Sequence, residues 1–331
     1  MTRLLGFLLM LAITLPQWSC GGQVSAGGGL SGAEGGSTLD GSLLAVINRM
    51  AGAPWGVPYS GNRVVSITGP SGLITFTESV AADGAGGFQL QPGEVLSGAV
   101  NAHDFLTDQE QGKGFQYRYR GFQVQDAQLL QLNYTVSVLS NQGVATAGIP
   151  CTQLHIQRKD AGAGVIDRLH YVVNVDPQTG VVLAWTQLDE AGNTVSMMEF
   201  ANFTYGEPAV EMYQSPMIEQ PLNVGEDLKA QLGFDVLRPG MLPRGYRMVT
   251  AAKVVTDETP WVRMVFSDGV ESLFLMHREP ELLAGVAQAS TLGSYENGER
   301  TVLMGTVNGF ELIAEGKFGS VWMQDFVSSC F

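Results

Sequence analysis

The sequence predicts an α+β protein built mainly from antiparallel strands. Two observations carry this prediction: short runs in which apolar and polar residues alternate, and clusters of Pro, Gly, Asn and Asp that separate the runs. The clearest case lies between residues 151 and 205, where turns at 176–180 and 189–193 join three strands into a meander. With 331 residues, of which 45% are apolar, the chain is long enough for about two domains with real cores.

The charge balance argues against one class of partner. The chain has 18 Lys and Arg residues against 32 Asp and Glu residues, which gives a formal net charge of −14. A surface of this sign repels phosphate backbones, so we do not expect nucleic acid as a partner.

Residues 1–26 are typical of an export signal. Arg3 precedes an apolar run over 4–15, which is too short to span a bilayer as a stable anchor. Two processing outcomes stay open: cleavage after Ala26, or a lipoprotein signal that ends before Cys20, whose thiol would then carry the lipid. The Gly/Ser-rich segment 27–41 is predicted to be a flexible tether.

Two cysteines remain after processing, Cys151 and Cys330. In an exported chain they could form one disulfide that ties the end of the chain to the first domain. Two buried thiols are the other interpretation, and the distance between them in sequence does not decide.

The first domain is predicted to span 42–206. It begins with an amphipathic helix over 43–50, in which apolar residues recur at helical spacing after Asp40 or Ser42 as a cap. The strands expected before the meander lie at 63–68, 74–80, 87–90, 115–124 and 129–139.

A proline-containing linker is predicted over 207–224, and a second domain over 225–331. The second domain starts with a short helix over 225–232, and Asp268-Gly269 and Asn308-Gly309 predict tight hairpins. Its expected strands lie at 247–255, 261–267, 271–278, 301–307 and 310–315, followed by a closing helix or strand over 322–331.

Three groups of motifs resemble one family. The first is the helix at 43–50 followed by 59–65, the second is 156–160 with the aromatic strand and Asp-x-x-Thr-Gly turn at 168–183, and the third is the Leu-Pro-x-Gly-aromatic turn at 242–246 with the Ser-Asp-Gly hairpin at 266–273. In this order they are similar to the periplasmic sigma-E regulatory proteins of the MucB/RseB type. The first domain of that family is similar to the lipoprotein carriers LolA and LolB.

The resemblance implies a LolA-like incomplete β-barrel with covering helices, followed by a smaller C-terminal α+β domain. It also implies a periplasmic protein, free or tethered as a lipoprotein, whose partners are an acyl chain of a lipid or lipoprotein and a membrane-anchored anti-sigma factor or another envelope protein. The residues expected to line the apolar cavity are Phe115, Tyr117, Tyr119, Leu154, Ile156, Tyr171, Val173, Ala184 and Met197. Plain core packing is the alternative role for each of them.

The residues favour binding over catalysis. Cys151 and His155 lie four apart on one strand, about 13 Å from each other, which is too far for a thiolate–imidazole pair. His155 and His170 would need Asp160 or Asp167 to complete a metal site, so we expect neither a metal nor a cofactor. A lipoprotein carrier without a regulatory role is the second hypothesis, and a secreted hydrolase, which lacks a triad signature, is the third.

Overall fold

The computed structural model describes residues 40–69, 72–85, 88–98, 122–159, 170–208, 218–255, 260–278, 290–297 and 300–331. The export signal, Cys20, most of the tether and the expected liners Phe115, Tyr117 and Tyr119 lie outside the described residues.

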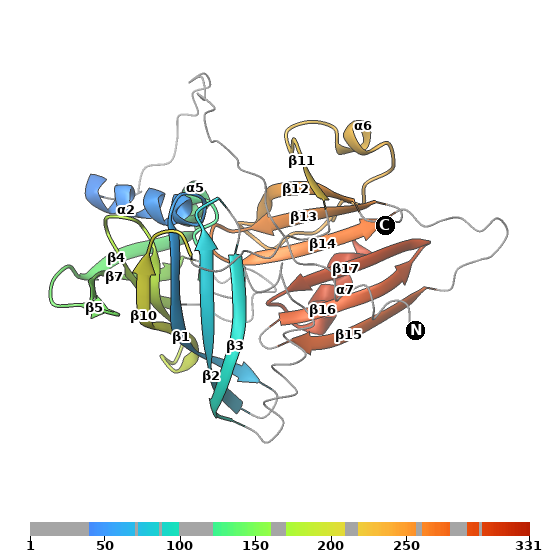
Figure 1. Cartoon of the computed structure of the whole chain (residues 1–331). Helices are drawn as coiled ribbons and strands as arrows, with labels where there is room; N and C mark the ends of the chain where they lie inside the picture. The colour runs from blue at the N-terminus through green and yellow to red at the C-terminus, as the bar shows by residue number, and fades with distance from the viewer. Residues whose placement is uncertain are drawn as a thin grey trace.

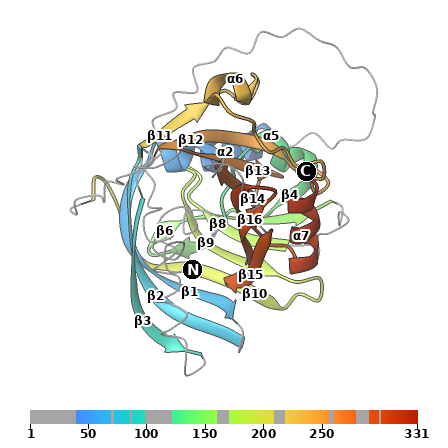
Figure 2. The same cartoon turned by 90° about the vertical axis from the view of Figure 1, so that its right-hand side faces the viewer.

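The N-terminal half forms one bent sheet of eight strands (Figures 1 and 2), in the order β3-β2-β1-β10-β9-β8-β7-β4 with every neighbouring pair antiparallel. The strands are β1 (Pro58–Gly69), β2 (Gly72–Asp83), β3 (Phe88–Ser97), β4 (Tyr134–Ser140), β7 (Thr152–Arg158), β8 (His170–Val175), β9 (Val182–Leu188) and β10 (Thr194–Tyr205). A short ribbon of β5 (Ala145–Thr146) and β6 (Ile149–Pro150) precedes β7. The predicted meander is confirmed as β8, β9 and β10. The two edge strands β3 and β4 do not pair with each other, so the sheet does not close into a complete barrel.

Helix α2 (Gly41–Gly52) covers one face of this sheet and continues into the 3-10 turn η1 (Ala53–Trp55). Asp40 caps the helix by accepting from the Ser42 backbone, and one apolar stripe (Leu43, Val46, Ile47, Met50) is buried. Gly180, with φ of +80°, ends the turn after β8 directly against α2, because a Cβ atom there would lie 2.3 Å from the carbonyl carbon of Arg49. The predicted helix and the predicted turn are therefore packed against each other.

The expectation of a single strand over 129–139 is wrong in its first half. Helix α5 (Ala127–Asn133) occupies it, and β4 begins only at Tyr134. Asp126 starts the helix by accepting from the backbone N–H groups of Gln128 and Leu129. Of the strand expected over 115–124, residues 122–124 are described and have no regular structure.

The C-terminal half forms a second antiparallel sheet of seven strands, in the order β11-β12-β13-β14-β17-β16-β15. The strands are β11 (Ile218–Leu222), β12 (Arg247–Val255), β13 (Trp261–Ser267), β14 (Ser272–Arg278), β15 (Thr291–Asn297), β16 (Arg300–Val307) and β17 (Phe310–Gly316). Helices α6 (Leu228–Leu232) and α7 (Ser320–Ser328) pack their buried leucine, methionine and phenylalanine side chains on one face of it. The mainly antiparallel α+β class is therefore confirmed.

Two details of the second domain differ from the sequence prediction, and the structure decides a third that the sequence left open. The segment expected to be a linker contains β11, an edge strand that tolerates Pro221 and pairs with β12. Strand β15 was not predicted, because its Gly293 and polar residues give no alternating pattern. The closing segment is the helix α7. Within the described residues, no helix combines the length and apolarity needed to cross a membrane.

Candidate ligand-binding face and the turn that closes it

Four of the expected liners lie together on the inner face of the first sheet, which is the face that packs against α2 and α5. Leu154 on β7 pairs with Val173 on β8, and Ile156 pairs with Tyr171. Each of the four side chains is at most 1% exposed and belongs to the first hydrophobic core. The sequence pattern therefore placed these residues on a common apolar face, and in this structure the protein's own side chains fill the space in front of them.

Ala184 and Met197 lie on the opposite, outer face. Ala184 pairs with Asn174 and Glu199, and Met197 pairs with Thr186, whereas the inner-face neighbours are Leu183, Trp185 and Met198. The expectation that Ala184 and Met197 face the cavity is therefore wrong. The residues next to them in each strand face inward, because a shift of one residue along a strand moves a side chain to the other face.

A turn of the second domain closes the inner face. This closing turn (residues 267–272) joins β13 to β14, and its Val270 side chain is buried within the core of the first domain. The Gln125 backbone N–H donates to the Gly269 carbonyl at 2.9 Å. The first domain's core is thus completed by an apolar side chain from the second.

Gly269 allows the closing turn to approach this closely. Its φ is +110°, and a Cβ atom there would lie 2.3 Å from the backbone nitrogen of Leu130 in α5. No side chain fits at this distance, so only glycine permits the contact. The Asp268-Gly269 hairpin predicted from sequence is confirmed, and it serves a contact between domains that the sequence did not reveal.

Asp268 anchors one side of the closing turn through residues of the first domain. Its carboxylate accepts from Arg158 at the end of β7 and from the Tyr134 hydroxyl, and it also accepts from the backbone N–H groups of Val270 and Glu271. Arg158 and Asp268 are both almost completely buried, and Arg158 donates a further bond to the Arg244 carbonyl at 2.7 Å. Burial raises the pKa of Asp268, and the charge of Arg158 opposes that shift.

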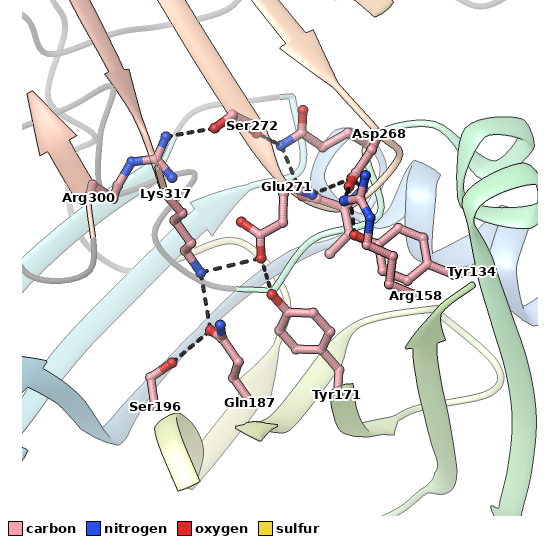
Figure 3. A network of polar contacts seen from close by, with 12 residues as sticks. Tyr134, Arg158, Tyr171, Gln187, Ser196, Asp268, Glu271, Ser272, Arg300 and Lys317 are labelled. Carbon is pink, nitrogen blue, oxygen red and sulfur yellow. Dashed lines mark hydrogen bonds and ion pairs between the residues drawn. The ribbon is translucent and has the colours of Figure 1, made fainter. Parts of the chain in front are cut away.

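Glu271 anchors the other side, as Figure 3 shows. Tyr171, one of the expected liners, donates a hydrogen bond from its hydroxyl to the Glu271 carboxylate. The Lys317 Nζ atom lies 3.4 Å from the same carboxylate oxygen. Lys317 also donates to Gln187 of β9 at 3.2 Å. Burial alone would raise the pKa of Glu271, but Lys317 and the Tyr171 hydroxyl together lower it below its usual value.

The sequence reasoning missed these anchoring residues, although one signal was present. Thr152, Leu154, Ile156 and Arg158 share one face of β7, so the alternation that buries the two apolar residues also places a charge at a buried position. A charged residue at a strand position that the alternation buries predicts a buried partner of opposite charge, since an unpaired buried charge is very costly. The sequence does not reveal that the partner lies 110 residues further along the chain.

Of the two interpretations of Cys151 and Cys330, the structure shows two separate thiols and no disulfide between them. Cys151 is a buried free thiol that packs in the first core, and Cys330 is a half-buried free thiol that packs against the second. Each thiol donates to a nearby carbonyl, Cys151 to Ile149 and Cys330 to Phe326. Burial raises the pKa of both thiols, so neither is activated as a nucleophile.

His155 and His170 are neighbours, as their places on adjacent strands suggested. Their rings are stacked with centroids 5.6 Å apart, and burial together with the charge of His170 lowers the pKa of His155. Asp160 and Asp167, the acids considered as a third ligand, lie outside the described residues. Among the described residues there is no group of three or more His, Cys, Asp and Glu side chains that could hold a metal ion.

Comparison with known proteins gives similarity only at the level of solved structures. No model of a known protein family matches the chain, and no curated protein matches it. A crystal structure of MucB is similar over 86% of this chain and 95% of that one, with a TM-score of 0.45 and 19% sequence identity. The crystal structure of MucB in complex with MucA(peri) and the Pseudomonas aeruginosa MucA/MucB complex each cover 86% of this chain and 96% of their own, with a TM-score of 0.45 and 16% identity.

Proposed function

We propose that this chain is an exported regulatory binding protein of the MucB/RseB type. In this proposal the inner face of the first domain accepts an apolar envelope ligand, a lipid or the acyl chain of a lipoprotein, and the protein also binds a membrane-anchored anti-sigma factor. The sequence motifs support the family, and the apolar character of the face shared by Leu154, Ile156, Tyr171 and Val173 supports the chemistry of the ligand.

One observation carries the regulatory part of the proposal. The face expected to meet the ligand is the face that the closing turn of the second domain contacts, through Val270 and through the bond from Tyr171 to Glu271. An acyl chain and Val270 cannot occupy the same space. A ligand on the inner face must therefore displace the closing turn, and this competition couples ligand binding to the placement of the second domain.

Burial of the acyl chain supplies the driving force for this displacement. Burying each methylene group contributes about 0.8 kcal/mol, so a chain of a few buried methylenes can offset the loss of the contacts made by one valine. The closing turn also makes charged contacts, which sets a threshold that weakly apolar ligands do not reach.

The structure suggests a sharper test than removal of the second domain. Deleting 225–331 would remove Val270 from the first core and leave Arg158 without Asp268. The remaining part would lose stability, so a change in its ligand binding would not report on the ligand site. Gly269→Ala instead forces the closing turn away from α5 in the full mature chain.

Gly233→Ala is the matched control. Gly233 has φ of +84° and nothing within 4 Å of the position of a Cβ atom, so it carries the backbone strain of the substitution without a steric clash. We expect Gly269→Ala to bind the fluorescent fatty acid cis-parinaric acid at least tenfold more tightly than the unmodified chain does, and Gly233→Ala to leave the affinity unchanged.

The same preparations test the partner. We expect the periplasmic segment of the anti-sigma factor encoded in the same genome to bind the unmodified chain, and cis-parinaric acid to weaken that binding. Absence of fatty-acid binding in both glycine variants would remove the apolar ligand from the proposal. Fatty-acid binding without any effect on the partner would leave the carrier of the LolA/LolB type as the better hypothesis.

A further inference from the structure

The outer face of the first sheet has a hollow that the proposed function does not use. A pocket of about 300 Å³ lies over four adjacent strands, β3, β2, β1 and β10. Six polar side chains of its lining carry the argument: Ser60, Asn62, Ser79, Gln89, Gln91 and Asn202. The volume lies at the lower end of the range for small-molecule sites, which is enough for one or two sugar rings.

The strand register explains why these side chains share one face. Asn62 of β1 lies opposite Ser79 of β2 and Asn202 of β10, and Ser79 lies opposite Gln91 of β3. The side chains of Val65 and Phe76 point to the inner face and pack in the first core. The pocket is therefore separated from the apolar face by the thickness of the sheet.

The described lining carries no charge. Every described residue that lines the pocket is uncharged, although the chain as a whole has a formal net charge of −14. A phosphate or carboxylate ligand would find no cation in this lining, and an amine would find no acid. An acyl chain would leave the amides and hydroxyls without partners, which is costly.

Hydrogen bonds within the pocket leave a defined set of unused groups. The Ser79 hydroxyl donates to Asn62 Oδ1 at 2.7 Å, and the Asn62 backbone N–H donates to Asn202 Oδ1 at 2.9 Å. These bonds use the amide oxygens, while the NH₂ groups of Asn62 and Asn202 donate to no described residue. Gln89 Oε1 is buried and accepts no hydrogen bond from a described residue.

We propose that this outer pocket binds a neutral oligosaccharide. A sugar hydroxyl both donates and accepts, so it can accept from an asparagine NH₂ group. It can also donate to Gln89 Oε1 once rotation of the Gln89 side chain turns this buried oxygen toward the pocket. An acetamido group offers the same two functions through its N–H and its carbonyl. A buried acceptor without a partner is rare in folded proteins, and a bound hydroxyl satisfies it.

The proposal is tested by titrating the full mature chain with the tetrasaccharide of N-acetylglucosamine. Saturation-transfer NMR and calorimetry measure the binding. We expect saturable binding, with Asn202→Ala and Gln89→Leu each weakening it at least tenfold. Thr186→Ala is the control, because Thr186 lies on the outer face of β9 away from the pocket lining, and we expect it to leave binding unchanged.

The stability of Gln89→Leu separates a binding role from a structural one. Removing an acceptor that has no partner should raise the Tm of the free protein while sugar binding is lost. A lower Tm together with unchanged sugar affinity would overturn the proposal, as would absence of binding to the tetrasaccharide. Binding of an uncharged Gly-Ser peptide in place of the sugar would also overturn it and assign the pocket to extended peptide.

This inference does not depend on the proposed function. Gly269→Ala changes the inner face, and we expect it to leave sugar binding unchanged. A failure of fatty-acid binding and a failure of sugar binding can therefore be told apart in the same preparation.

Discussion

The two faces of the first sheet share the same strands but differ in what meets them. The inner face is apolar and is filled by α2, α5 and Val270 of the second domain. The outer face over β1, β2, β3 and β10 carries uncharged amides and hydroxyls around a hollow. The alternation of side chains along a strand produces both surfaces from one stretch of sequence.

The difference shows where the two domains depend on each other. The charged contacts of the closing turn with Arg158 and Lys317 lie on the inner side, and none of the described residues that line the outer pocket is ionisable. Changes at the contact between domains should therefore alter the binding of apolar ligands, whereas changes in the outer pocket should alter the binding of polar ligands and leave the binding of apolar ligands unchanged. The three predictions that follow test this separation.

The largest effect is expected for Arg158→Ala. It leaves the Asp268 carboxylate buried without its cation, which should lower the free energy of unfolding by about 3–5 kcal/mol. Urea denaturation followed by circular dichroism measures this. The matched control is Arg247→Ala, which removes the solvent-exposed pair with Asp126 across the same two domains and should cost about 0–1 kcal/mol. Equal losses in the two variants would show that the buried pair has no special role.

A smaller loss is expected for Val270→Ala. The substitution removes two buried methyl groups from the first core, which should lower the free energy of unfolding by about 2 kcal/mol, including the small cavity left behind. Val321 is 71% exposed, so Val321→Ala should change stability by a few tenths of a kcal/mol and serves as the control. If the two substitutions cost the same, Val270 does not complete the first core.

Much of the fold follows from local patterns in the sequence. The meander, the helix α2 and the two hairpins with Asp-Gly and Asn-Gly were predictable because turn residues and alternation act over a few residues. Strand β15 and the helical start of the segment at 127–133 were not, since Gly293 weakens one pattern and the Asp126 cap overrides another.

The candidate site was predictable only in part. Alternation placed Leu154, Ile156, Tyr171 and Val173 on one face, but Ala184 and Met197 required the strand register, which the sequence does not contain. The role of the closing turn depends on contacts between residues 100 or more positions apart in the sequence, such as Tyr171 and Glu271. A pattern within one strand carries no information about a pairing of that kind.

The smallest effect is expected from acid. The pKa of Glu271 is lowered in the folded protein from its usual value of 4.5, so the stability it contributes is present above that pH and is lost as the pH falls through the folded pKa. Asp268 acts in the opposite sense, because its pKa in the folded protein is raised from 3.8. The stability that the protonated Asp268 side chain contributes is lost as the pH rises through the folded pKa. Glu271→Gln should therefore destabilise the protein at pH 7, where Lys317 loses its counter-charge, and the loss should shrink as the pH falls below 4.5.

Denaturation of the unmodified chain and of Glu271→Gln at pH 7, 5, 4 and 3.5 measures this change, with oligosaccharide binding recorded at the same pH values while both chains remain folded. The part of the outer pocket's lining that the structure describes has no titrating group, so we expect the affinity for the tetrasaccharide to stay constant across this range. A constant affinity together with a shrinking stability difference would separate the two faces, because only the inner face is held by groups that take up protons. If the affinity instead fell in parallel with the stability of the contact between domains, the two faces would be coupled through the sheet, and the outer pocket would report on the position of the closing turn.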